Sequence, residues 1–231
     1  MKLFENRSNI PLDVIRFIDS FVYTKINNDN IHEAVDLWCE NEQQCKIIYG
    51  HISRWNTSKV TNMSKLFFKK ENFNEDISRW NVSNVTDMSK MFYCAKKFNQ
   101  DISQWNVSNV TDMSCMFFLA KNFNSDISGW DVSNVTDMLG MFCSTSNFNS
   151  DISNWDVSNV TDMTSMFSRT IFFNSKISRW NVSNVTTMYC MFYFACSFNS
   201  DISQWNVSNV TDSSNIFYDC NIEKHHKPHF N

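Results

Sequence analysis

A tryptophan returns every 25 residues through most of this chain. The series consists of Trp55, Trp80, Trp105, Trp130, Trp155, Trp180 and Trp205, and no insertion interrupts it. Around each tryptophan the chain repeats a unit of the form Phe-Asn-x-Asp-Ile-Ser-x-Trp-Asx-Val-Ser-Asn-Val-Thr-Asp-Met-x-x-Met-Phe. A fixed period of this length is typical of arrays in which each unit packs only against its neighbours. The sequence therefore predicts a stack of turns, and the unit is too short for a propeller blade.

The spacing inside one unit predicts two short elements. Ile102 precedes Trp105 by three residues, and Val107 follows the tryptophan by two, which places Trp105 and Val107 on one face of an extended segment. Apolar side chains then recur at the i, i+3, i+4 and i+7 spacing of a helix, in the set Met113, Met116, Phe117 and Ala120. We therefore expect an α/β solenoid of the leucine-rich-repeat type, with one short parallel strand and one short helical segment in each 25-residue turn.

The pattern Ile-x-x-Trp-x-Val-Ser-x-Val-Thr-x-Met-x-x-Met-Phe resembles the BspA-like leucine-rich repeat family, in its tryptophan-containing branch. The resemblance covers residues 48–217 and includes seven copies in phase. Proteins of that family occur on bacterial and protozoan surfaces, and similar arrays occur in large DNA viruses of amoebae. The resemblance implies adhesion or protein binding rather than catalysis.

The ends of the chain differ from the array and predict three regions. Residues 1–47 are expected to form an N-terminal helical cap, residues 48–217 the seven-turn array, and residues 218–231 a flexible polar tail. The first helix of the cap would begin near Pro11, with an apolar stripe of Leu12, Ile15, Ile18 and Phe21. A second helix would begin after Asn30, with an apolar face of Ile31, Ala34, Val35 and Trp38.

A second resemblance begins at Ile10. The stretch IPLDVIRFI is similar to the opening of an F-box over about a dozen residues. F-box segments dock on a ubiquitin-ligase adaptor, so this resemblance implies a ligase substrate receptor as an alternative function. A plain helical cap explains the same residues without that role.

Composition and charge exclude several classes of partner. The 20 lysines and arginines against 24 aspartates and glutamates give a formal charge of −4, which offers no basic field for nucleic acid. No apolar run is long enough to span a bilayer. Because the start of the chain has no signal-peptide pattern, we expect the protein in the host cytoplasm or a virion.

The sequence contains no motif for catalysis. All five histidines lie near the ends of the chain, outside the regular turns, so no catalytic triad can be assembled from the array. We therefore expect no enzyme activity, no cofactor and no metal site. The aspartates one turn apart, Asp76, Asp101, Asp126, Asp151 and Asp201, would repel one another unless backbone hydrogen bonds or a cation between them offset the repulsion. Lys176 interrupts this series, so an obligate metal site is not expected.

The residues on either side of each tryptophan form the predicted binding surface. Because they alternate with the buried Trp and Val positions, they should point onto the concave face of the solenoid. The candidates are Arg54, Arg79, Asn81, Gln104, Asn106, Asp131, Asn154, Asp156, Arg179, Asn181 and Gln204. Together they predict an acidic centre flanked by arginines, and hence a non-enzymatic scaffold for protein–protein interaction. A structural or self-assembling virion or surface protein is the remaining alternative.

Overall fold

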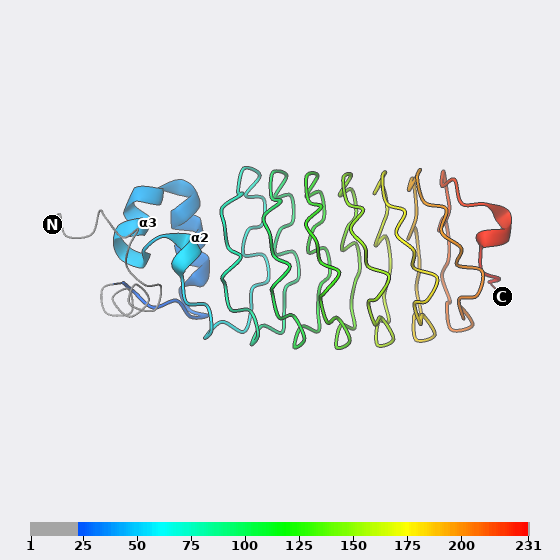
Figure 1. Cartoon of the computed structure of the whole chain (residues 1–231), viewed down its shortest axis with the longest axis horizontal. Helices are drawn as coiled ribbons and strands as arrows, with labels where there is room; N and C mark the ends of the chain where they lie inside the picture. Colours follow the sequence, from blue (N-terminus) through cyan, green and yellow to red (C-terminus); the bar gives the residue numbers. More distant parts are fainter. Residues whose placement is uncertain (1–22, 231) are drawn as a thin grey trace.

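The computed structural model describes residues 23–230 and shows a regular array of 25-residue turns that follows N-terminal helices. The elements are the α-helices α2 (Ile31–Glu40) and α3 (Glu42–Tyr49), and the 3₁₀ helices η1 (Ile52–Arg54) and η2 (Lys224–His226). Figure 1 shows the turns side by side along the long axis, with α2 and α3 at one end and η2 at the other. No helix within these residues is long and apolar enough to cross a membrane.

Helix α2 carries the predicted apolar face. Ile31, Ala34, Val35 and Trp38 are all buried, which confirms the spacing argument for this helix. Asn30 does not cap the helix through its side chain, because its Oδ1 accepts a hydrogen bond from Asn27 and its Nδ2 donates to Lys25. The Trp38 ring meets the first tryptophan of the array, Trp55, with centroids 6.4 Å apart. The helix predicted to begin at Pro11 lies outside the described residues.

The segment predicted to be helical consists instead of two successive β-turns. The Met116 N–H donates to the Met113 carbonyl at 3.1 Å, and the Ala120 N–H donates to the Phe117 carbonyl at 2.9 Å. Cys115 and Leu119, the third residues of these turns, have φ values of 53° and 58°, as type II turns require. Both a helix and such turns return side chains to one side every three to four residues, so the spacing could not distinguish them.

Backbone hydrogen bonds join these turns to the next turn of the stack. The N–H groups of Met113, Cys115, Phe117 and Leu119 donate to the carbonyls of Asp137, Leu139, Met141 and Cys143, at distances of 2.7–3.1 Å. We call residues 112–119 and their equivalents, 62–69, 87–94, 137–144, 162–169, 187–194 and 212–219, the turn ladder. Parallel pairing reaches only isolated bridges in it, from Asn62 with Asp87 through to Thr187 with Asp212.

The strand predicted around the tryptophan is also absent from the described residues. The Trp105 N–H bonds inside its own turn, to the Ile102 carbonyl at 3.1 Å, so it cannot join a ladder. Side chains make the connections between turns here. The Asn109 Nδ2 donates to Ser83 of the preceding turn at 2.7 Å, and the Asn99 Oδ1 accepts from the Asn124 N–H at 2.8 Å. The two asparagine series thus satisfy backbone groups where a strand would have used its own.

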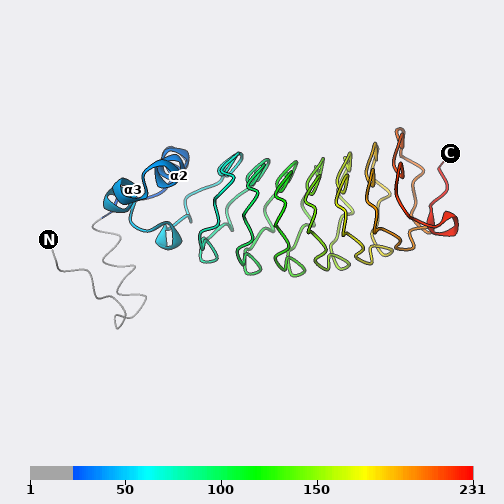
Figure 2. The same ribbon diagram turned by 90° about the horizontal axis from the view of Figure 1, so that it is seen from above.

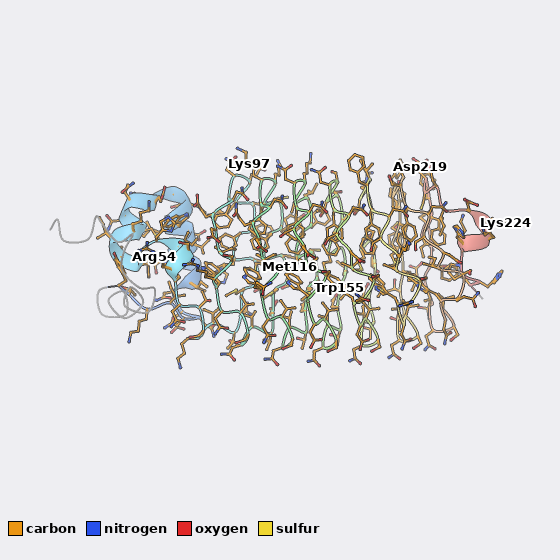
Figure 3. All side chains as sticks on the ribbon, viewed as in Figure 1. Arg54, Lys97, Met116, Trp155, Asp219 and Lys224 are labelled. Atoms are coloured by element: carbon orange, nitrogen blue, oxygen red, sulfur yellow. The ribbon has the colours of Figure 1, made fainter. Side chains whose placement is uncertain are left out.

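The interior of the stack is apolar and largely aromatic. The tryptophans of the array are 3–5% exposed, and the phenylalanines at the position of Phe117, from Phe67 to Phe192, are fully buried. Rings in neighbouring turns stack on one another, as Phe92 does on Phe117 with centroids 5.5 Å apart. Figure 2 shows each turn as a flattened loop, and Figure 3 places Met116 and Trp155 in the middle of the stack.

The last residues pack against the array, so the expectation of a flexible tail was wrong. Ile222 is 5% exposed, and the Glu223 N–H donates to the Asn199 Oδ1 at 2.9 Å. The Ile202 N–H donates to the His226 carbonyl at 3.0 Å. Residues 220–230 therefore cover the tryptophan side of the last turn.

Candidate functional site

The predicted binding residues lie together on one side of the stack. Arg54, Arg79, Asn81, Gln104, Asn106, Asp131, Asn154, Asp156, Arg179, Asn181 and Gln204 are all exposed. They form two files, one on each side of the buried tryptophans, and we call this surface the tryptophan face. Their exposure follows from the alternation in the sequence, even though no strand forms. Their part in binding stays a prediction.

The residues of one file, those that directly follow the tryptophans, accept hydrogen bonds within their own turns. The Asn81 Oδ1 accepts hydrogen bonds from the Ser83 N–H at 3.0 Å and from the Ser83 hydroxyl at 2.7 Å. The backbone bond is repeated two residues after each later member of the file, Asn106, Asp131, Asp156, Asn181 and Asn206. At Asp156, hydrogen bonds from the Ser158 hydroxyl and N–H lower the pKa of the carboxyl. The predicted acidic centre therefore consists of carboxylates that cap their own turns.

Hydrogen bonds also account for the other aspartate series. The Asp101 Oδ1 accepts from the Ser103 N–H at 2.9 Å. Equivalent bonds occur at Asp76, Asp126, Asp151 and Asp201. These bonds lower the pKa of all five carboxyls and offset the repulsion along the series. Within residues 23–230, no three His, Cys, Asp or Glu side chains are placed to hold a metal ion.

A second surface, only partly exposed, lies on the turn ladder. The outward side chains at the positions of residues 114, 115, 118 and 119 form what we call the ladder face. Residue types change from turn to turn here: the position of Leu119 holds Lys69, Cys94, Leu119, Ser144, Arg169, Phe194 and Asp219. The prediction of a helical segment gave no reason to single out these positions. The signal was present as the variable residues of the Met-x-x-Met-Phe-x-x pattern.

Aromatic and cationic groups meet near the C-terminal end of the ladder face. The Arg169 guanidinium lies 5.8 Å from the Tyr193 ring centroid and 5.4 Å from that of Phe194. Tyr218 continues the group, with centroids 5.2 Å from Tyr193 and 5.6 Å from Phe194. We call Arg169, Tyr193, Phe194 and Tyr218 the C-terminal aromatic cluster. Of the five strongly exposed large apolar residues in the described chain, four lie in these last turns: Ile171, Phe172, Tyr189 and Tyr218.

His51 has a local role at the start of the array. Its Nδ1 lies 2.9 Å from the Ser53 hydroxyl, and its ring packs edge-on against Trp38 with centroids 4.8 Å apart. Burial lowers the pKa of this histidine. These contacts position the residue that precedes η1 and give the histidine a structural role.

Residues 39–138 and 120–229 match the family described as "Mycoplasma protein of unknown function, DUF285". The chain belongs to the DUF285 family. This repeat family is related to BspA-like and leucine-rich-repeat-like repeats, so the inferred relationship is correct at that level. The DUF285 match spans the described array, whereas the F-box-like residues 10–22 lie outside both the match and the described residues. No curated protein and no solved structure matches the chain significantly.

Proposed function

We propose that this chain is a solenoid that binds another protein and performs no chemistry of its own. The observation that carries the proposal is the C-terminal aromatic cluster with its exposed neighbours. Tyrosine, phenylalanine and arginine are enriched at protein interfaces, and tyrosine and arginine at the residues that contribute most binding energy. Isolated exposed apolar residues are ordinary, but a group confined to three successive turns of a regular array favours a contact surface.

The ladder face is a better candidate for recognition than the tryptophan face. On the tryptophan face, each Asn or Asp that directly follows a tryptophan accepts a hydrogen bond from its own turn through a side-chain oxygen. These residues therefore recur for structural reasons. On the ladder face, the changing side chains are not required by the repeat. Variation between otherwise identical turns is how repeat proteins acquire distinct surfaces.

The chemistry of the cluster favours a protein partner with apolar side chains and a carboxylate. Tyr218 of the cluster and Phe172, three residues after Arg169 in the chain, are 56% and 57% exposed and would lose contact with water on binding. Arg169 stacks on two rings and makes no ion pair within residues 23–230, so its guanidinium can pair with a carboxylate of the partner. We place this partner in the host cytoplasm or a virion. The net charge of −4 disfavours nucleic acid.

The test compares three baits in pull-downs followed by mass spectrometry. The ladder variant carries Arg169→Glu and Tyr218→Ser, and the tryptophan-face variant carries Arg79→Glu and Arg179→Glu. All four positions are exposed, so both variants should keep the melting temperature of the natural chain. We expect a partner that the natural chain and the tryptophan-face variant retain and the ladder variant loses.

Other outcomes would identify the alternatives. Loss from the tryptophan-face variant alone, or from a bait reversed at Asp131 and Asp156, would move the binding surface to that face. Recovery of a ubiquitin-ligase adaptor by all baits would favour the receptor function through residues 10–22. Turnover of any substrate by the purified chain would contradict the proposal.

A further inference from the structure

The ladder face carries basic side chains but no carboxylate over its first six turns. Its charged residues there are Lys65, Lys69, Lys90 and Arg169, and the first acidic residue at these positions is Asp219, in the last turn. The whole chain, by contrast, has 24 acidic residues against 20 lysines and arginines. The charge of this face is therefore opposite in sign to that of the protein.

The lysines of this surface lie together at its N-terminal end. Three belong to the first two ladder turns, and two lie on the segments that directly follow the second and third ladder turns. We call these five the basic patch: Lys65, Lys69, Lys90, Lys97 and Lys121. Lys90 is half-buried and the other four are exposed. None of them makes an ion pair within residues 23–230, where the paired lysines are Lys46, Lys70 and Lys96.

Carboxylates near the basic patch have partners elsewhere in the fold. Glu71 pairs with Lys96 at 2.7 Å. Asp112, at the start of its ladder turn, accepts a hydrogen bond of 2.8 Å from the Ser114 N–H, and the equivalent bond occurs at Asp87. The ammonium groups of the basic patch therefore depend on water or on another molecule for a counter-charge.

The distance from the basic patch to the C-terminal aromatic cluster suits a short extended segment. Tyr193 lies four turns after the turn of Lys90, which is about 20 Å at roughly 4.8 Å per turn. An extended chain advances about 3.3 Å per residue, so about six residues cover this distance. The ladder-face residues of the two turns between them include no carboxylate, and several are small: Gly140, Cys143, Ser144, Ser165 and Ser168. Figure 3 shows Lys97 and Asp219 at the same edge of the stack, near opposite ends of the array.

We propose that the basic patch binds an acidic stretch of the same extended partner segment whose apolar side chains contact the C-terminal aromatic cluster. The inference rests on the proposed function, since the cluster is the other half of this surface. The segment carries several Asp or Glu residues about six positions from its apolar side chains. Opposite charges at one end and apolar contacts at the other fix the direction and register of the segment on the array.

The aromatic rings beside the basic patch favour a protein segment over a single-stranded nucleic acid. Bases bind to such surfaces by stacking on the open faces of aromatic rings. The Tyr93 ring is already stacked between Phe68 and Phe118, with centroids 4.9 Å and 4.6 Å away. The Lys69 ammonium lies 5.2 Å from the centroid of the Phe68 ring. Carboxylates need only the ammonium groups, which are accessible.

The test measures peptide binding to the full-length chain by fluorescence anisotropy. The labelled probe has the sequence EEEESSLFLD, in which the acidic and apolar halves are about six residues apart and the last residue supplies a carboxylate for Arg169. The basic-patch variant carries Lys65→Glu, Lys69→Glu and Lys90→Glu. We expect saturable binding to the natural chain and a loss of about tenfold in affinity in this variant, because like charges then face each other. A peptide with lysines in place of the four glutamates should show the reverse preference.

Two further variants separate the site from general effects of charge and folding. A chain with Arg54→Glu, Arg79→Glu and Arg179→Glu changes the net charge equally on the tryptophan face and should bind the probe as the natural chain does. A chain with Ser at positions 65, 69 and 90 removes the three charges without reversing them and should lose less affinity. Serine already occupies these positions in other turns, at Ser144 and Ser165, with φ values of 58° and 55°, so this chain should fold normally.

Equal affinity of the natural chain and the basic-patch variant for the probe would overturn the proposal. Tighter binding of a ten-nucleotide thymidine oligonucleotide than of the probe would also overturn it, if the basic-patch variant loses the oligonucleotide.

The ladder variant, with Arg169→Glu and Tyr218→Ser, distinguishes this proposal from the proposed function. Loss of the probe by the ladder variant alone would support the aromatic cluster and overturn the acidic stretch. Loss by the basic-patch variant alone would contradict the contact with the cluster. Loss by both variants is the expected result.

Discussion

The indole Nε1 of Trp105 donates a hydrogen bond of 3.2 Å to the carbonyl oxygen of Ile77, one turn earlier in the stack. The same bond runs from each later tryptophan, as from Trp130 to Ile102 at 3.1 Å. The indole thus fills the interior and also joins two turns by a hydrogen bond. On this side of the stack, the backbone hydrogen bonds lie mostly within one turn. This double role explains why the position is tryptophan in every turn and never a smaller aromatic residue.

Replacing one indole should therefore lower the free energy of unfolding by more than the loss of buried volume alone would. Trp130→Phe keeps an aromatic ring but removes one of the two hydrogen bonds that the Ile102 carbonyl accepts, the other being from the Trp105 N–H, and leaves a gap in the core. We expect a loss of about 2–4 kcal/mol in the free energy of unfolding, measured by urea denaturation. Gln104→Ala, on the exposed side of the same turn series, should change it by less than about 0.5 kcal/mol. Equal effects from the two substitutions would contradict a stabilising role for the indole and its hydrogen bond to the preceding turn.

The type II turns of the ladder hold ordinary residues in a conformation that favours glycine. Lys90 has a φ of 57°, and Gly140, at the equivalent position, has the same value. Lys90→Gly should stabilise the chain by about 1 kcal/mol and Gly140→Ala should destabilise it by a similar amount. An added Cβ at Gly140 would also lie 3.3 Å from the Cys115 Sγ.

Gly129 provides the matched control for this prediction. Its φ is not positive, and nothing lies within 4 Å of an added Cβ. Gly129→Ala should be neutral or slightly stabilising in thermal melts. Destabilisation by all three substitutions would show that the ladder turns relax out of the left-handed region.

Asp137 should be a source of instability at neutral pH. Burial, followed by the neighbouring Asp112 and Asp162, raises the pKa of its carboxyl, so the folded state disfavours the ionised form. Asp137→Asn mimics the protonated group and can still accept from Leu139, as Asn62 accepts from Ser64 in the same position. We expect the melting temperature to rise by about 2 °C at pH 7.

The pH dependence checks the cause of that gain. Because the folded pKa is raised, the penalty disappears as the pH falls below the ordinary aspartate value of about 4. The two chains should then melt together. Asp212→Asn is the control, because hydrogen bonds from Ser214 lower the pKa of Asp212 and the substitution should not stabilise at pH 7. A gain at pH 7 that persists at pH 3 would point to packing instead of charge.

The exposed aspartates should stabilise the fold at neutral pH, in contrast to Asp137. Hydrogen bonds from serines lower the folded pKa of Asp76, Asp101, Asp126, Asp151 and Asp201, so the unfolded chain binds more protons in the acid range. Their contribution is present above about pH 4 and is lost as the pH falls through the lowered values. A chain with all five changed to Asn keeps the caps, as Asn81 shows, but not the titration. Its melting temperature should vary less between pH 2 and 5, and parallel curves would contradict this account.

The sequence was sufficient for the period, the interior and the repeat relationship. The strict 25-residue spacing of Trp, Met and Phe leaves one arrangement in which every copy buries the same side chains, and those side chains are buried. The helical pattern from Ile31 to Trp38 was also sufficient, since a single face of that helix had to be covered. The exposure of the residues beside each tryptophan followed from the same alternation.

The tertiary structure decided where the backbone bonds go. A spacing of three to four residues suits both a helix and a pair of type II turns, and only the neighbouring turn, by offering carbonyls to Met113, Cys115, Phe117 and Leu119, favours the turns. On the tryptophan side, the indoles and asparagines supply the hydrogen bonds between turns, so no strand is needed. The direction of the ladder bonds depends on contacts between residues about 25 positions apart. Local sequence patterns carry no information about such contacts, because each turn adopts its conformation only against the next.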